Sequence, residues 1–113
     1  MIPRRVVDQA AKIPISGDFI VFELYRKFIK KKRSLRINSI IIKPGKRIER
    51  EIERNYEHIY YVVEGVGKIE YPELDKAMPI EPLSLIYVPV ALKHVIVNIG
   101  TTDLHIIDLI LVE

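Results

Sequence analysis

The sequence contains no cysteine and no tryptophan. Without cysteine the chain cannot form disulfides, bind a metal through thiolates or use a thiol nucleophile. The basic pair Arg4–Arg5 is not followed by the apolar segment of a secretory signal, and every hydrophobic run is too short to cross a bilayer. We therefore expect a cytoplasmic protein with no membrane partner.

Motifs of several functional classes are missing as well. The sequence has no Ser–His–Asp set and no glycine-rich loop of the kind that cradles phosphates, which argues against a hydrolase or a nucleotide-binding protein. The basic run Lys30–Arg33 could contact phosphate or an acidic partner. It lacks the interleaved aromatic residues that single-stranded nucleic-acid binding needs. We interpret it as a solvated turn between two strands and expect no nucleic-acid partner.

What the sequence does contain is enough apolar material for one hydrophobic core. Its 113 residues are the size of one domain, and 49% of them are hydrophobic. We expect a single domain over 1–113, with an N-terminal arm at 1–17 and a β-barrel at 18–113. Abundant isoleucine together with lysine and glutamate is typical of proteins from hot environments, so we also expect a thermophilic source.

β-Branched and aromatic residues fill most segments between the Pro and Gly turn signals, which predicts many short strands. A short helix is predicted at Arg4–Lys12, ended by Pro14. The stretch Glu73–Glu81, which holds several prolines, is predicted to be an excursion between strands. The predicted strands are Phe19–Phe28, Leu35–Ile42, His58–Glu64, Lys68–Tyr71, Leu83–Val88, Lys93–Asn98 and Leu104–Val112. The predicted fold is an all-β, small antiparallel β-barrel with at most one or two short helices.

Two motifs carry a resemblance to a known family. The stretch PGKRIEREIERNYEHIYYVVEG at 44–65 keeps the spacing of the first cupin motif, G-x5-H-x-H-x4-E-x6-G. Glu51 and Glu53 replace its two histidines, and His58 replaces its glutamate. In the second motif, Pro89, His94 and Asn98 match. The chain thus resembles the cupin superfamily, a jelly-roll-like barrel. The sequence segments Glu57–His58 and IYVPVALKH are also similar to the cupin part of mannose-6-phosphate isomerase/guanylyltransferase enzymes.

The resemblance implies a metal site inside the barrel. Cupin positions matching Glu51, Glu53, His58 and His94 hold one divalent metal, and two carboxylates with two imidazoles suit Mn, Fe, Zn or Ni. In the alternative, a register shifted by one residue turns Ile52 and Arg54 inward and leaves the glutamates in solvent.

Three further polar positions have two interpretations each. Tyr60 shares the His58 face and Asn98 follows His94, so both are candidates for lining a ligand cavity. The alternatives are barrel packing for Tyr60 and a turn for Asn98. His105 on the last strand is expected at the surface or at an interface.

Three functions remain open for such a barrel, because the fold hosts many unrelated activities. The first is a protein that binds a divalent metal, a small-molecule ligand or both inside the barrel. The second is a metal-dependent enzyme of the oxygenase or sugar-isomerase type. The third is a metal-free barrel with a role in assembly. Because many strands are apolar on both faces, we also expect a homodimer that covers one face.

Overall fold

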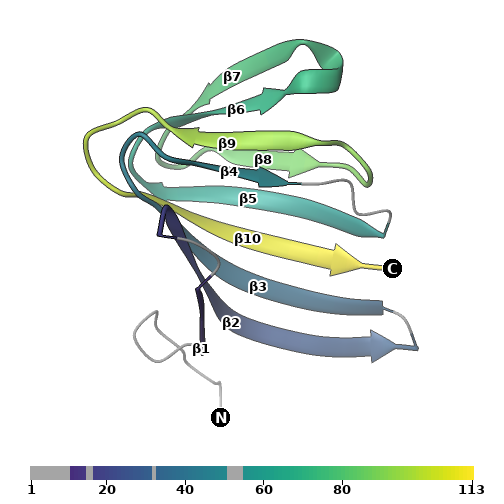
Figure 1. Ribbon diagram of the computed structural model, residues 1–113. Helices are drawn as coiled ribbons and strands as arrows, with labels where there is room; N and C mark the ends of the chain where they lie inside the picture. The colour runs from purple at the N-terminus through teal and green to yellow at the C-terminus, as the bar shows by residue number, and fades with distance from the viewer. Residues whose placement is uncertain (1–10, 15–16, 32, 51–54) are drawn as a thin grey trace.

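The computed structural model describes residues 11–14, 17–31, 33–50 and 55–113, and these form two antiparallel sheets that curve around a common interior (Figure 1). The larger sheet has the strand order β1-β2-β3-β10-β5-β8 and the smaller sheet has the order β4-β9-β6-β7. The strands of the larger sheet are β1 (Ala11–Pro14), β2 (Phe19–Lys30), β3 (Arg33–Ile42), β5 (Tyr56–Glu64), β8 (Leu85–Val88) and β10 (Leu104–Val112). Those of the smaller sheet are β4 (Arg47–Arg50), β6 (Gly67–Tyr71), β7 (Lys76–Ile80) and β9 (His94–Asn98).

Both sheets turn an apolar face towards the interior. Successive residues of a strand point to opposite faces, so every second residue of each strand enters the core. In β10 these are Leu104, Ile106, Asp108 and Ile110, all buried. Fourteen buried apolar side chains from both sheets form one continuous core. The prediction of an all-β barrel-like fold is confirmed.

Three local predictions differ from the structure. The C-terminal end of the predicted helix is wrong: Ala11 and Lys12 belong to β1, which pairs with β2, and the rest of that segment lies outside the described residues. The predicted excursion contains β7, which forms a hairpin with β6 through the short 3-10 helix η2 (Pro72–Leu74). Residues Arg47–Arg50, where no strand was predicted, form β4 and pair with β9.

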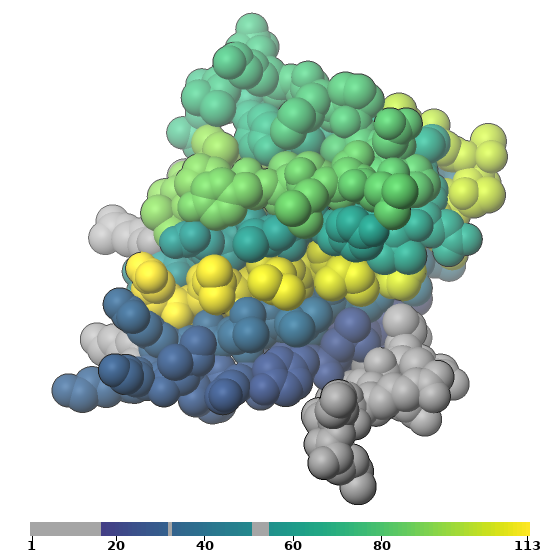
Figure 2. Space-filling model, turned by 180° about the vertical axis from the view of Figure 1, so that it is seen from behind, coloured from purple at the N-terminus to yellow at the C-terminus, as the bar shows by residue number. Residues whose placement is uncertain are grey.

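The outer face of the larger sheet is apolar too. Figure 2 shows this face, with β10 lying between β3 and β5. Its exposed side chains include Tyr61 and Val63 of β5, and Leu85 and Tyr87 of β8, which are 69% and 56% exposed. Among the described residues, no helix is long and apolar enough to cross a membrane.

Candidate functional site

One end of the barrel interior collects polar side chains from both sheets. In the smaller sheet, Arg50 of β4 is the register partner of His94 of β9. In the larger sheet, Asp108 of β10 is the partner of Tyr60 of β5, and His58 lies two residues before Tyr60 on the same face. We call these five residues, Arg50, His58, Tyr60, His94 and Asp108, the interior polar cluster. All are buried except Arg50, whose side chain is 19% exposed.

Asp108 links two members of the cluster. Its Oδ1 atom lies 2.9 Å from Nδ1 of His58, and its Oδ2 atom lies 3.3 Å from a terminal guanidinium nitrogen of Arg50. A carboxylate only accepts hydrogen bonds, so His58 carries its proton on Nδ1 and donates it. The lone pair of a neutral His58 is therefore on Nε2, which points away from Asp108. Asp108 fixes both the tautomer and the orientation of this ring.

The hydrogen bonds of His94 also define its tautomer. Its Nδ1 atom lies 2.8 Å from the carbonyl oxygen of Leu92, which only accepts, so Nδ1 is the protonated nitrogen. Its Nε2 atom must then accept, and the Tyr60 hydroxyl donates to it across 2.7 Å. Both nitrogens of His94 are engaged within the protein.

Ring packing holds the cluster together. The His58 and Tyr60 rings stack with centroids 5.3 Å apart, and both rings meet His94 edge-on at 5.7 and 5.5 Å. The Tyr71 ring of β6 lies 6.5 Å from the His94 ring. The two histidines therefore lie next to each other inside the barrel, together with Tyr60.

Burial sets the protonation of these rings. Desolvation is the main cause that lowers the pKa of His94 to about 4, and the neighbouring His58 and Arg50 charges act in the same direction. Burial likewise raises the pKa of Tyr60 and of Tyr71 above the ordinary value of 10. At neutral pH, His94 is therefore an uncharged acceptor and both tyrosines keep their hydroxyl protons.

The described residues of the cluster do not fit a metal ion as they are arranged. Nε2 of His94 accepts from Tyr60, and both carboxylate oxygens of Asp108 are bonded to other members. The Arg50 guanidinium would add a positive charge beside a dication. Within the described ranges, no group of three or more His, Asp or Glu side chains could hold a metal.

The other predicted site residues are not members of the interior polar cluster as described. Glu51 and Glu53, and the alternative pair Ile52 and Arg54, lie outside the described residues. Asn98 is buried at the opposite end of β9 from His94. Its Nδ2 donates to the carbonyls of Ile42 and Thr102 at 2.8 Å each, and its Oδ1 accepts from the Gly100 amide at 2.9 Å. These bonds hold a turn.

His105 and Tyr61 point away from the cluster. His105 lies on the outer face of β10 and bonds the Ser39 hydroxyl, and burial lowers its pKa. Tyr61 also points outward, as the alternation along β5 predicts.

Sequence reasoning missed three residues of this region. Asp108 is the one acidic residue at the inward positions of β10, between Ile106 and Ile110, and the sequence shows it as a lone charge in an apolar run without telling which face it takes. Arg50 is hidden in the alternating charges of residues 47–54. Tyr71 was assigned to a strand without a role.

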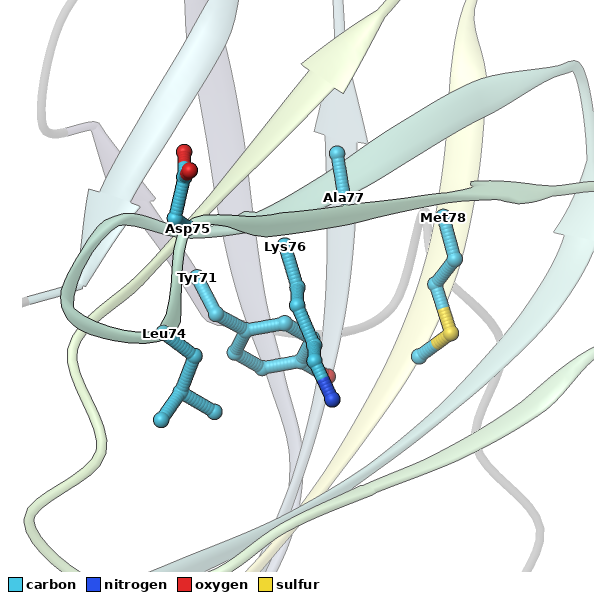
Figure 3. A pocket seen from close by; sticks show the side chains of 6 residues that line it. All are labelled: Tyr71, Leu74, Asp75, Lys76, Ala77 and Met78. Carbon is cyan, nitrogen blue, oxygen red and sulfur yellow. The ribbon is translucent and has the colours of Figure 1, made fainter.

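A pocket opens beside Tyr71 in the β6–β7 hairpin. It has a volume of about 460 Å³ and is lined by Tyr71, Leu74, Asp75, Lys76, Ala77 and Met78. Figure 3 shows the Leu74, Lys76 and Met78 side chains on the same side of the hairpin as the Tyr71 ring, whereas Asp75 and Ala77 point the other way. Because Tyr71 also contacts His94, this pocket adjoins the interior polar cluster.

Comparison with known proteins decides the family. The model of the mannose-6-phosphate isomerase C-terminal family matches residues 19–112, almost the whole chain. The chain belongs to this family. No curated protein sequence matches this cupin-like chain.

Solved structures show the same barrel at low sequence identity. The polyketide cyclase RemF from Streptomyces resistomycificus is 16% identical with a TM-score of 0.77, and the alignment covers 100% of this chain and 81% of that one. KdgF from Halomonas sp. is 16% identical with a TM-score of 0.74 and coverages of 96% and 91%. The Cupin_2 domain of an XRE family transcriptional regulator from Enterobacter cloacae is 18% identical, with a TM-score of 0.72 and coverages of 83% and 96%. At these identities the likeness shows the cupin fold alone.

Proposed function

We propose that this cupin barrel binds a small organic molecule in its interior, with His58, Tyr60 and His94 as the polar groups that the ligand contacts. The observation that carries the proposal is the interior polar cluster itself. Burying polar and charged side chains costs free energy unless each is hydrogen-bonded, and apolar residues of similar size would fill the same space without this requirement. A cluster of this kind in an otherwise apolar barrel is therefore better explained by ligand recognition than by folding.

The adjoining pocket supports the same proposal. Small-molecule sites are mostly apolar cavities of roughly 300–1,000 Å³ with a few convergent polar groups. The pocket beside Tyr71 has a volume in this range, and Tyr71 connects it to His94. A ligand in the pocket would lie against Tyr71, which contacts His94 of the cluster.

A second candidate function is proton transfer on the bound molecule. The 2.9 Å bond to Asp108 orients His58 and leaves its Nε2 as the basic nitrogen. His58 can take up a proton there from one atom of a bound molecule and return it to another atom of the same molecule. This chemistry uses the described residues alone.

The three histidines provide a direct test with an internal control. A library of small organic molecules is screened by NMR, and the imidazole signals of His58, His94 and His105 are followed. Ligands that enter the barrel shift the signals of His58 and His94, whereas His105 on the outer face stays unchanged. Hits that shift only His105 or other outer-face residues would refute interior binding, and so would a library with no hits.

A further inference from the structure

The chemistry of the ligand can be inferred from a row of side chains across the inner face of the smaller sheet. Arg50 of β4 lies opposite His94 of β9, the Tyr71 ring of β6 lies 6.5 Å from His94, and Lys76 of β7 is the register partner of Tyr71. Neighbouring strands are about 4.8 Å apart, so the row is roughly 14 Å long. Positive charges occupy both of its ends.

Of the six residues that line the pocket, Lys76 is the only charged one whose side chain lies on the same side of the hairpin as the pocket's apolar groups. In Figure 3 the Lys76 side chain runs from β7 on the side of the Tyr71 ring, Leu74 and Met78, and the Asp75 carboxylate points away. The pocket thus combines apolar walls with one ammonium group. This is the surface that an amphipathic anion complements.

The charge of Lys76 is available to a ligand. Among the residues that the structure describes, no carboxylate lies within ion-pair distance of its ammonium group. The outer face of the same hairpin differs, because Lys68 pairs with Glu70 at 3.3 Å. The Tyr71 hydroxyl, protonated at neutral pH, adds a hydrogen-bond donor beside Lys76.

Buried donors deeper in the barrel point to the same kind of ligand. The Nε atoms of Arg50 and Arg36 are buried and have no hydrogen-bond partner in the described part of the chain. Arg36 lies on β3 opposite Ile110, and its guanidinium is 5.5 Å from the centre of the Tyr56 ring. Among the described side chains, Asn38 Oδ1 is the one buried acceptor in the same condition. Guanidinium donors of this kind form strong hydrogen bonds with the oxygens of an acceptor-rich molecule.

We propose that the ligand is a small organic acid whose anionic group binds Lys76 and whose apolar body lies against Tyr71, Leu74 and Met78. This inference rests on the proposed function and names the class of molecule that it concerns. A carboxylate and a phosphate monoester share the required chemistry. The neutral amide of the same acid keeps the shape and loses the charge.

The test uses three probes of one shape: phenylacetate, phenyl phosphate and the neutral phenylacetamide. Each is titrated into the ¹⁵N-labelled full chain, and the amide signals of residues 71–78 are followed together with the histidine signals. We expect phenylacetate or phenyl phosphate to bind at least ten-fold more tightly than phenylacetamide, and the comparison of the two acids distinguishes a carboxylate from a phosphate ligand.

A pair of variants tests the role of Lys76. Lys76→Met keeps the aliphatic stem and removes the charge, and it should weaken binding of the preferred acid about ten-fold, as expected for a lost hydrogen bond to a charged group. Lys68→Met makes the same change on the outer face of the hairpin and should leave the affinity unchanged. Lys76 is exposed and the Lys68 side chain is 42% exposed, and the ¹⁵N spectrum of each variant reports directly that the barrel is folded.

The outcomes separate this inference from the proposed function. Equal affinity for acid and amide, an unchanged affinity in Lys76→Met, or no shift at residues 71–78 with any probe would overturn the organic-acid proposal. If phenylacetamide still shifts His58 and His94, interior binding stands and only the ligand class is wrong. If an acid shifts residues 71–78 and leaves both histidines unchanged, the acid pocket stands and interior binding fails.

Discussion

Replacing Asp108 with alanine should strongly destabilise the protein. Asp108 is fully buried and bonds both His58 and Arg50, so its removal leaves a largely buried guanidinium and a buried imidazole N–H without an acceptor. Removing one partner of a buried ion pair costs about 3–5 kcal/mol. Because the Arg50 side chain keeps 19% exposure and can be partly hydrated, we expect the lower end, about 3 kcal/mol.

Urea unfolding at one fixed protein concentration measures this loss. Thermal unfolding gives a second measure of the same loss. At about 4 °C per kcal/mol for a domain of this size, the melting temperature should fall by about 12 °C. Glu73→Ala, which removes an exposed carboxylate in η2, should change the free energy of unfolding by less than about 0.5 kcal/mol. Adding Arg50→Ala to Asp108→Ala should cost less than the sum of the two single changes, because the unpaired charge is gone.

A loss below about 1 kcal/mol in Asp108→Ala, or strict additivity of the two changes, would show that Asp108 does not organise the cluster. That result would also remove the structural reason for the orientation of His58.

Three other expectations follow from the same geometry. Because the pKa of His94 falls from 6.5 to about 4 on folding, the unfolded chain takes up a proton first, and stability should decrease by about 3 kcal/mol between pH 6.5 and 4; a His94 NMR titration midpoint near 6 would contradict this. The apolar outer face should pair two copies, so light scattering should give twice 13.2 kDa, and Leu85→Lys with Tyr87→Lys should give monomer; a wild-type monomer would refute the pairing. Protein purified without an affinity tag should carry much less than one metal ion per chain, and a stoichiometric metal in elemental analysis would reject the metal-free cluster.

The motif spacing predicted the fold and the proximity of His58 and His94 inside it. His58 and His94 are far apart in the sequence, yet their rings lie 5.7 Å from each other, as expected for two positions that point into one barrel. Tyr60 was assigned to the His58 face by alternation alone, and it lies there. These predictions succeeded because strand period and motif spacing act together.

Asp108 could not be assigned to the inner or the outer face of the last strand, because the sequence does not show which residues of that strand point inward. Its outward residues, such as Ile107 and Leu109, are as apolar as its inward ones, since the outer face of the larger sheet is itself apolar. An alternation that is apolar on both faces does not tell which side a lone acidic residue takes. The tertiary pairing with β3 and β5 supplies this information. Arg50 was missed for a different reason. It belongs to a run of alternating charges that resembles a solvated face, so the sequence does not show that one of these charged residues turns inward.

We propose that His58 and His94 belong to a hydrogen-bonded cluster that is prepared for a ligand and whose described residues do not hold a metal. A long-range ¹H–¹⁵N correlation spectrum of the imidazoles at pH 7 tests it most directly, because the ¹⁵N shifts identify the tautomer and the state of each nitrogen. We predict that both rings carry their proton on Nδ1 and that Nε2 of His94 has the shift of a neutral, hydrogen-bonded acceptor. A proton on Nε2 of His94, a doubly protonated His94 ring, or the shift of a metal-bound nitrogen would contradict this prediction.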